Sequence, residues 1–234
     1  MALNQVKHKG IILKVLKAIF SNNTISPLLG FKGGTAVYLF YNLPRFSVDI
    51  DLDLLDESKK DVVFKEVTSI LKKYGEIKEA EEKSHNLFFL LSYAEKKEGD
   101  QNLKIDINLR ALGSKYEVKS YLGISMKVMV QEDMSAHKMV AMVERIGRTN
   151  RDIFDVWFIL ENDWPINKQI VEERMSMSYK DFLKKSITSL EALTDHDILA
   201  NMGELLDDKQ KVWVKAKLRT DTIFLFKLAL ENQQ

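Results

Sequence analysis

The chain has 234 residues, of which 45% are hydrophobic and 29% are charged, as in an ordinary globular protein. Its sequence contains no cysteine, which excludes disulfides, thiolate zinc sites and a cysteine nucleophile. The formal net charge of +1 lacks the basic excess of proteins that bind nucleic acid mainly through its phosphates. No apolar run is long enough to span a membrane, and lysines interrupt the N-terminus, so we expect a cytoplasmic protein without a membrane partner.

The N-terminal part of the sequence predicts a helix, a glycine turn and an acidic strand. Apolar residues at helical spacing predict an amphipathic helix over residues 3–20. Gly33, Gly34 and Thr35 open a second, short helix over residues 35–42. Pro44 and Arg45 then turn the chain into a strand over residues 48–54.

The strand over residues 48–54 carries three carboxylates on one face. Asp49, Asp51 and Asp53 share that face because side chains alternate along a strand. Carboxylates about 7 Å apart repel one another unless cations lie between them, and Mg²⁺ together with substrate phosphates would meet this need. The alternative is a solvated edge strand after a tight turn with a helix cap. Because the acids directly follow a glycine turn at a helix start, we favour a site for phosphates and metal.

These residues carry a family resemblance. Gly33-Gly34-Thr35, a short helix and a strand with Asp49 and Asp51 resemble the signature of the DNA polymerase β-like nucleotidyltransferase superfamily. The longer sequence segments, from Phe31 to Ala36 and from Arg45 to Asp51, resemble those of the AbiEii-type toxins of bacterial type IV toxin–antitoxin and phage-defence systems. The resemblance implies that Gly33, Gly34 and Thr35 bind a nucleoside triphosphate, and that Asp49 and Asp51 bind Mg²⁺ or Mn²⁺.

The next predicted elements lead to a third carboxylate. They are a helix over 57–74, a strand hairpin over 76–83 and 87–94, a charged loop over 95–102 and a strand over 103–109. Asp106 shares the polar face of the last strand with Lys104 and Asn108, a position typical of an exposed residue. The resemblance instead implies that Asp106 is the third metal ligand of a two-metal phosphoryl transfer.

A short strand is expected to end at residues 128–129, and two helices follow, from residue 131 and from about residue 150. Helical spacing places Lys138 and Arg145 on one face of the first helix, and Asp152 and Asp155 one turn apart on the second. In one interpretation these charges form ion pairs that hold the two helices together. In the other, Lys138 binds the triphosphate while the aspartates orient it or contact the nucleotide.

The segment Ala136-His137-Lys138, followed by Arg145, Asp152 and Asp155, also resembles the toxin family. This resemblance favours the functional interpretation for Lys138 and Asp152. Both interpretations stay open for Arg145 and Asp155. The four histidines lack metal-ligand spacing and are interpreted as non-catalytic. Further helices are expected near 167–176, 178–192, 197–206 and 209–231, with lysines that form a solvated face or contact RNA.

The predicted fold is α/β, of the α+β kind, with a polymerase β-like nucleotidyltransferase core and a small mixed sheet over residues 1–130. A helical domain follows over 131–234, and NTP and metal are expected in the cleft between the two.

The expected reaction transfers NMP from the NTP to an acceptor hydroxyl. The resemblance implies a toxin that acts on tRNA and has a cognate antitoxin protein or regulator. The alternatives are a nucleotidyltransferase that modifies a protein or small molecule, and a non-catalytic nucleotide-binding regulator. The predicted catalytic residues are Asp49, Asp51, Asp106, Lys138 and Asp152; the predicted nucleotide-binding residues are Gly33, Gly34, Thr35, Lys138, Arg145 and Asp155; the predicted metal ligands are Asp49, Asp51 and Asp106.

Overall fold

A computed structural model describes residues 3–93, 101–194 and 198–233 of the protein. The chain divides into two compact units, Met1–Met129 and Val130–Gln234. The first unit is built on a seven-stranded mixed sheet, and the described part of the second is helical. This combination confirms the predicted fold class.

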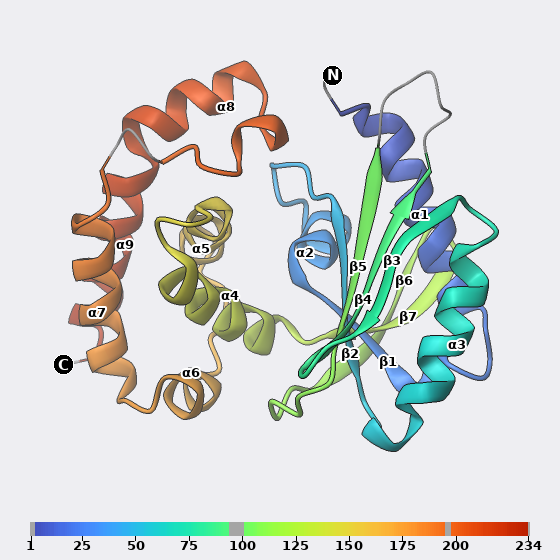
Figure 1. Ribbon diagram of the computed structural model, residues 1–234. Helices are drawn as coiled ribbons and strands as arrows, with labels where there is room; N and C mark the ends of the chain where they lie inside the picture. Colours follow the sequence, from blue (N-terminus) through green and yellow to red (C-terminus); the bar gives the residue numbers. More distant parts are fainter. Residues whose placement is uncertain (1–2, 94–100, 195–197, 234) are drawn as a thin grey trace. The chain divides into compact units, whose positions relative to one another are not determined.

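In the first unit, helices and strands alternate as far as β3 (Figure 1). The rest of this unit consists of the β3–β4 hairpin, strand β5 and the β6–β7 hairpin. The sheet order is β3-β4-β5-β2-β1-β7-β6, and only β2–β5 and β1–β7 pair in parallel among the described strands. The elements are α1 (Gln5–Phe20), η1 (Ser26–Leu28), β1 (Leu29–Lys32), α2 (Gly33–Tyr41), β2 (Asp49–Leu54), η2 (Glu57–Lys59), α3 (Lys60–Leu71), β3 (Glu76–Glu82), β4 (Asn86–Ser92), β5 (Asn102–Asn108), β6 (Tyr116–Tyr121) and β7 (Ile124–Met129).

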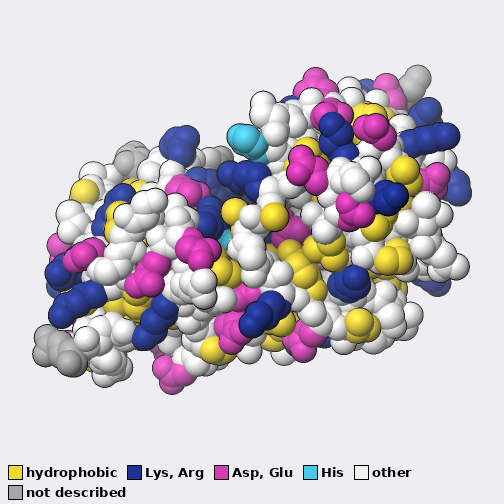
Figure 2. All heavy atoms as spheres, turned by 90° about the horizontal axis from the view of Figure 1, so that it is seen from below, with side chains coloured by type: hydrophobic (Ala, Val, Ile, Leu, Met, Phe, Trp, Pro, Cys, Tyr) yellow, Lys and Arg dark blue, Asp and Glu magenta, His cyan; other side chains and the backbone are white. Residues whose placement is uncertain are grey.

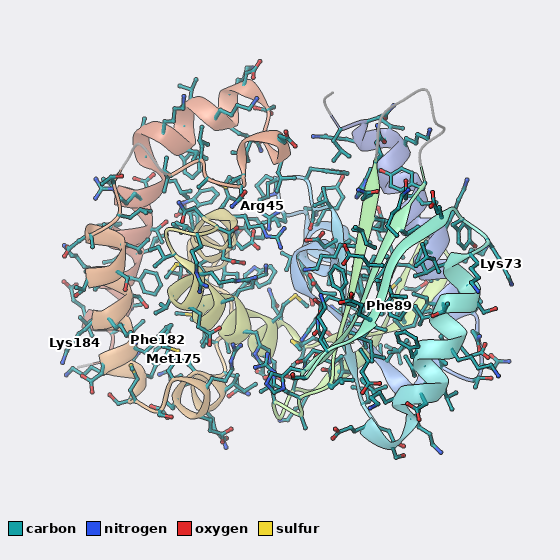
Figure 3. All side chains as sticks on the ribbon, in the orientation of Figure 1. Arg45, Lys73, Phe89, Met175, Phe182 and Lys184 are labelled. Carbon is teal, nitrogen blue, oxygen red and sulfur yellow. The ribbon has the colours of Figure 1, made fainter. Side chains whose placement is uncertain are left out.

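Apolar and polar residues alternate along these strands, so one face of the sheet is apolar and the other carries the polar side chains. Figure 1 shows α1 and α3 on one face and α2 on the other. Phe89, labelled in Figure 3, is fully buried and packs its ring 5.2 Å from that of Phe64 on α3. The strand residues that share this apolar face are also fully buried, namely Ile50, Leu52, Ile105 and Ile107. The alternate residues, which include the acidic ones, therefore face the side of α2.

The second unit is a helical bundle whose apolar sides face inward. Phe182 on α7 is fully buried, whereas Lys184 points outward from the same helix (Figure 3). None of the described helices is long and apolar enough to cross a bilayer. The elements are α4 (Gln131–Arg145), α5 (Arg151–Glu161), α6 (Lys168–Met175), α7 (Tyr179–Glu191), η4 (Gly203–Leu205), α8 (Asp208–Trp213), η5 (Val214–Leu218, a π-helical segment) and α9 (Arg219–Glu231).

Three local expectations need correction. The helix predicted over 197–206 is wrong, because residues 198–202 form turns, Asn201 has a φ of 57°, and only Gly203–Leu205 is helical, as a 3-10 turn. The β6–β7 hairpin was predicted only at its last two residues. Its turn is made by Leu122 and Gly123, with φ values of 48° and 77°, a pair of positive angles that suits a two-residue hairpin. Strand β1 was not predicted.

The loop expected over 95–102 falls largely outside the described residues, and its last residue, Asn102, belongs to β5. The helix expected over 57–74 is shorter, with a 3-10 turn followed by α3 and an end at Leu71. The helix expected over 209–231 is present as α8, η5 and α9 in direct succession.

Candidate active site

The glycine turn joins β1 to α2 and lies directly against Asp51. Gly33, with a φ of 78°, begins α2, and a Cβ added there would lie 2.9 Å from Cγ of Asp51. Any other residue would therefore strain the backbone and displace the carboxylate. Lys32, the N-cap residue of α2, makes no side-chain capping hydrogen bond to the first turn. The amides at this helix start, with the positive end of the helix dipole, suit an anionic ligand.

Thr35 holds this helix start to β2. Its side chain is buried, and its hydroxyl donates to the carbonyl oxygen of Asp49 and lies 2.9 Å from Oγ of Ser47. The hydroxyl therefore positions the strand that carries the acids. A contact between Thr35 and a phosphate would be left to its main-chain N–H.

The carboxylates predicted from separate strands lie next to one another. Asp51 of β2 and Asp106 of β5 are register partners in the parallel pair, so their side chains leave the same face of neighbouring strands. Asp49 lies one step along that face, opposite Lys104. Oδ2 of Asp106 accepts a hydrogen bond of 2.8 Å from Asn86 and lies 3.6 Å from Nζ of Lys104. The two strands thus place Asp51 beside Asp106, and Asp49 lies one step further along the same face.

The chemistry of these acids fits a hard divalent cation. Among the described residues, no three His, Asp or Glu side chains form a group that could hold a metal ion by themselves. Mg²⁺ does not need such a group, because it keeps several waters and binds through one or two carboxylates together with substrate phosphates. The neighbouring carboxylates of Asp51 and Asp106, beside an anion-binding helix start, offer this combination.

Asp53, whose role the sequence left open, is enclosed by donors. Its Oδ1 accepts from Nζ of Lys32 at 2.6 Å and from Nδ2 of Asn108 at 2.7 Å, and its Oδ2 accepts from the hydroxyl of Tyr116 at 2.6 Å. The ring of Tyr116 passes over Gly30, where an added Cβ would lie 2.8 Å from Cζ. Asp53 therefore ties β1, β5 and β6 to β2. The sequence shows that Asp53 shares a strand face with Asp49 and Asp51, but it does not show the partners of Asp53.

A buried histidine supports the start of β2. His8 on α1 donates from Nε2 to the carbonyl oxygen of Val48 at 2.8 Å, and its Nδ1 accepts from the hydroxyl of Tyr93. Burial lowers the pKa of His8 below its ordinary value of 6.5, although the Val48 carbonyl and Asp49 oppose this shift. Burial also raises the pKa of Tyr93 to about 12. Both groups are therefore neutral at pH 7, and the hydrogen bonds of His8 hold α1 to the start of β2.

An aromatic ring and two lysines lie beside Asp106. Phe88 of β4 is the register partner of Asp106, and its ring is half-buried. Nζ of Lys83 lies 4.0 Å and Nζ of Lys104 lies 5.7 Å from the centroid of this ring. The sequence pattern does not reveal this group, because Phe88 is one apolar residue among several in an apolar strand.

In the second unit, the four predicted charged residues of α4 and α5 form one network. Nζ of Lys138 lies 2.6 Å from Oδ2 of Asp155 and 3.2 Å from Oδ1 of Asp152. Nη2 of Arg145 lies 2.8 Å from Oδ2 of Asp152, as an ion-pair partner without hydrogen-bond geometry. Lys138 and both aspartates are buried, whereas 39% of the Arg145 side chain is exposed. Two positive and two negative charges balance, which is the arrangement that the structural interpretation requires.

Comparison with known proteins gives the family. A family model described as nucleotidyl transferase AbiEii toxin, type IV toxin–antitoxin system, matches residues 14–220. No curated protein matches the chain.

Two solved structures show a similar fold. JHP933 from Helicobacter pylori is 20% identical, with a TM-score of 0.63 and coverage of 100% of this chain and 96% of that chain. The nucleotidyltransferase toxin MenT4 (Rv2826c) from Mycobacterium tuberculosis H37Rv is 16% identical, with a TM-score of 0.61 and coverage of 95% and 84%. At these identities the likeness concerns the fold alone. The family match, in contrast, spans most of the sequence and includes every residue of the site described above except His8, and the chain therefore belongs to the AbiEii family of nucleotidyltransferase toxins of type IV toxin–antitoxin systems.

Proposed function

We propose that the protein uses a divalent metal ion to transfer NMP from an NTP to a hydroxyl at the end of a tRNA. The observation that carries this proposal is the juxtaposition of Asp51 with both Gly33 and Asp106. It places a carboxylate pair next to the start of α2, where the N-cap residue Lys32 makes no side-chain capping hydrogen bond. Amides for phosphate and oxygen ligands for metal are then available to one nucleotide.

The bond changes follow from the chemistry of phosphoryl transfer. The acceptor oxygen bonds to the α-phosphorus as the bond to the departing pyrophosphate breaks, and the acceptor hydroxyl loses its proton. Asp49, Asp51 and Asp106 would hold Mg²⁺ or Mn²⁺, which supplies charge stabilisation for the phosphates. Amides of Gly34 and Thr35 would bind outgoing phosphate oxygens.

Asp106 is the candidate for the group that receives or directs the acceptor proton. Its Oδ2 is held by Asn86, and Oδ1 has no hydrogen-bond partner among the described residues. A fixed carboxylate with one available oxygen can accept a hydrogen bond from a hydroxyl. Its side chain is 24% exposed, so an acceptor can reach it.

The surroundings of Asp106 favour a polynucleotide acceptor. Bases stack on half-buried aromatic rings, and lysines nearby can bind phosphates, which is the combination that Phe88, Lys83 and Lys104 offer. Stacking of a base is stronger than the exposed cation–π contact that it would replace. Charges of both signs alternate over the face seen in Figure 2, so that face offers no broad basic surface. Affinity for RNA would then depend on such local groups.

Lys138 would contribute a third hydrogen bond to a phosphate oxygen, since two of its three donors are used by Asp152 and Asp155. Arg145, with its exposed guanidinium, is the second candidate for nucleotide contact in this network. As a member of a toxin–antitoxin family the protein has an expected antitoxin. We further propose that the antitoxin binds it directly, that the pair acts in phage defence, and that the reaction takes place in the cytoplasm, where NTP and tRNA are found.

The deciding experiment follows the label from an α-³²P-labelled NTP. The protein, each of the four NTPs in turn, Mg²⁺ and total RNA should together yield a labelled band of tRNA size. Asp106→Asn should abolish the label, whereas Asp61→Asn, on the exposed side of α3, should keep it. Label in protein alone would favour a protein-modifying enzyme. NTP binding without any transfer would favour a nucleotide-binding regulator.

The acceptor subsite has its own test. Phe88→Leu should raise the KM for the RNA acceptor about fivefold or more, because stacking on an aromatic ring contributes about 1–3 kcal/mol per base. Phe88→Tyr keeps the ring and should keep the KM. An unchanged KM in Phe88→Leu would remove this ring from the acceptor site without affecting the donor site.

A further inference from the structure

Lys32 lies opposite one acid of the site but pairs with another. In the antiparallel pair of β1 and β2, Lys32 is the register partner of Asp51. Residues directly opposite in such a pair have side chains close enough to interact, and opposite charges attract. Yet Nζ of Lys32 lies 2.6 Å from Oδ1 of Asp53, two residues further along the same face. The ammonium group is thus drawn diagonally away from its direct partner.

Asp53 is held in the position that makes this possible. Asn108 donates to the same oxygen as Lys32, and Tyr116 donates to the other oxygen. Gly30, the register partner of Asp53, leaves space for the Tyr116 ring. With both oxygens engaged and the residue 5% exposed, Asp53 itself is poorly suited to bind a metal ion.

We propose that Asp53 is a positioning residue that keeps the Lys32 ammonium away from Asp51, and so preserves Asp51 as a metal-binding carboxylate. An ammonium paired with Asp51 would occupy an oxygen that the metal needs and would cancel its negative charge. This inference rests on the proposed metal site at Asp51. Asp53 would then have two roles: it links neighbouring strands to β2, and it holds an ammonium group that would otherwise compete with the metal.

The test measures binding of Mn²⁺ itself to the full chain, by the loss of the free-ion signal in electron paramagnetic resonance. Asp53→Asn should weaken Mn²⁺ binding about ten- to a hundredfold, as expected when a group that supports a metal ligand is removed. The double variant Asp53→Asn/Lys32→Met removes the competing ammonium as well and should restore an affinity close to that of the natural chain. Melting temperatures of all variants show which of them are folded.

The double variant decides the matter even if Asp53→Asn alone fails to fold, because it carries no unpaired buried charge. Weak Mn²⁺ binding by the folded double variant would overturn the proposal, and so would unchanged binding by folded Asp53→Asn. Asp51→Asn separates this failure from that of the proposed function. If Asp51→Asn binds Mn²⁺ as well as the natural chain does, the metal site itself is wrong. If it loses Mn²⁺ while Asp53→Asn does not, only the role of Asp53 is wrong.

Discussion

Replacing Lys138 with methionine separates the two interpretations of the charged network in α4 and α5. The substitution keeps an unbranched side chain that is one atom shorter and removes its charge. Asp152 retains Arg145 as an ion-pair partner, 2.8 Å away. Asp155 is 0% exposed and loses the ammonium that lies 2.6 Å from it.

The expected loss of stability is large. Removal of one partner from a buried ion pair is strongly destabilising and costs about 3–5 kcal/mol. A folded domain is stable by only about 5–15 kcal/mol in total. For a unit of this size, the midpoint of thermal unfolding should fall by more than about 10 °C. Arg145→Met should cost less, because 39% of the arginine side chain is exposed and Asp152 keeps Lys138.

Stability alone cannot reveal a role in the reaction, so the assay pairs calorimetry with the labelling reaction. The triple variant Lys138→Met/Asp152→Asn/Asp155→Asn removes all three buried charges together and should recover most of the lost stability. We expect it to remain inactive, because no ammonium is left for the triphosphate. A stable triple variant with full activity would refute the proposal that Lys138 binds phosphate and would leave the network a purely structural role.

Two further predictions concern residues that shape the site. Gly33→Ala should reduce transfer at least tenfold and lower the melting temperature, because it strains a positive φ and displaces Asp51; Gly10→Ala, inside α1 with open space around it, should stabilise the protein by up to about 1 kcal/mol. An active Gly33→Ala variant would argue against the close approach of turn and carboxylate. The lowered pKa of His8 means that the unfolded chain takes up a proton below pH 6.5 while the folded chain does not, so its contribution to stability is present above pH 6.5 and is lost below it. His8→Gln should flatten the fall in melting temperature between pH 7.5 and 5.5, whereas exposed His85→Gln should leave that fall unchanged.

The sequence predicted the parts of the site that are set by local chemistry. A glycine pair before a helix and acids at every second position of a strand follow from backbone geometry over a few residues, so Gly33, Asp49 and Asp51 could be placed in advance. The family resemblance supplied Asp106, whose neighbour Asp51 is 55 positions earlier. The structure then showed that the two are register partners.

Long-range contacts could not be predicted in this way. Nothing local links Tyr116 to Asp53, because the contact depends on the β6–β7 hairpin, most of which escaped prediction. Thr35 was expected to bind the triphosphate, but its hydroxyl donates to the carbonyl oxygen of Asp49, a partner 14 residues away. For Lys138, the pattern allowed both an ion pair and a phosphate contact. The ion pair is present, and the phosphate contact stays a prediction.

The parallel pairing of β2 with β5 sets the time at which the acids can meet during synthesis. Asp51 leaves the ribosome long before Asp106, and α3 and the β3–β4 hairpin are made between them. Loop closure over so many residues is a late and comparatively slow event. A nascent or truncated chain that ends before β5 lacks this carboxylate pair. The pair therefore forms only when β5 has been made and has paired with β2.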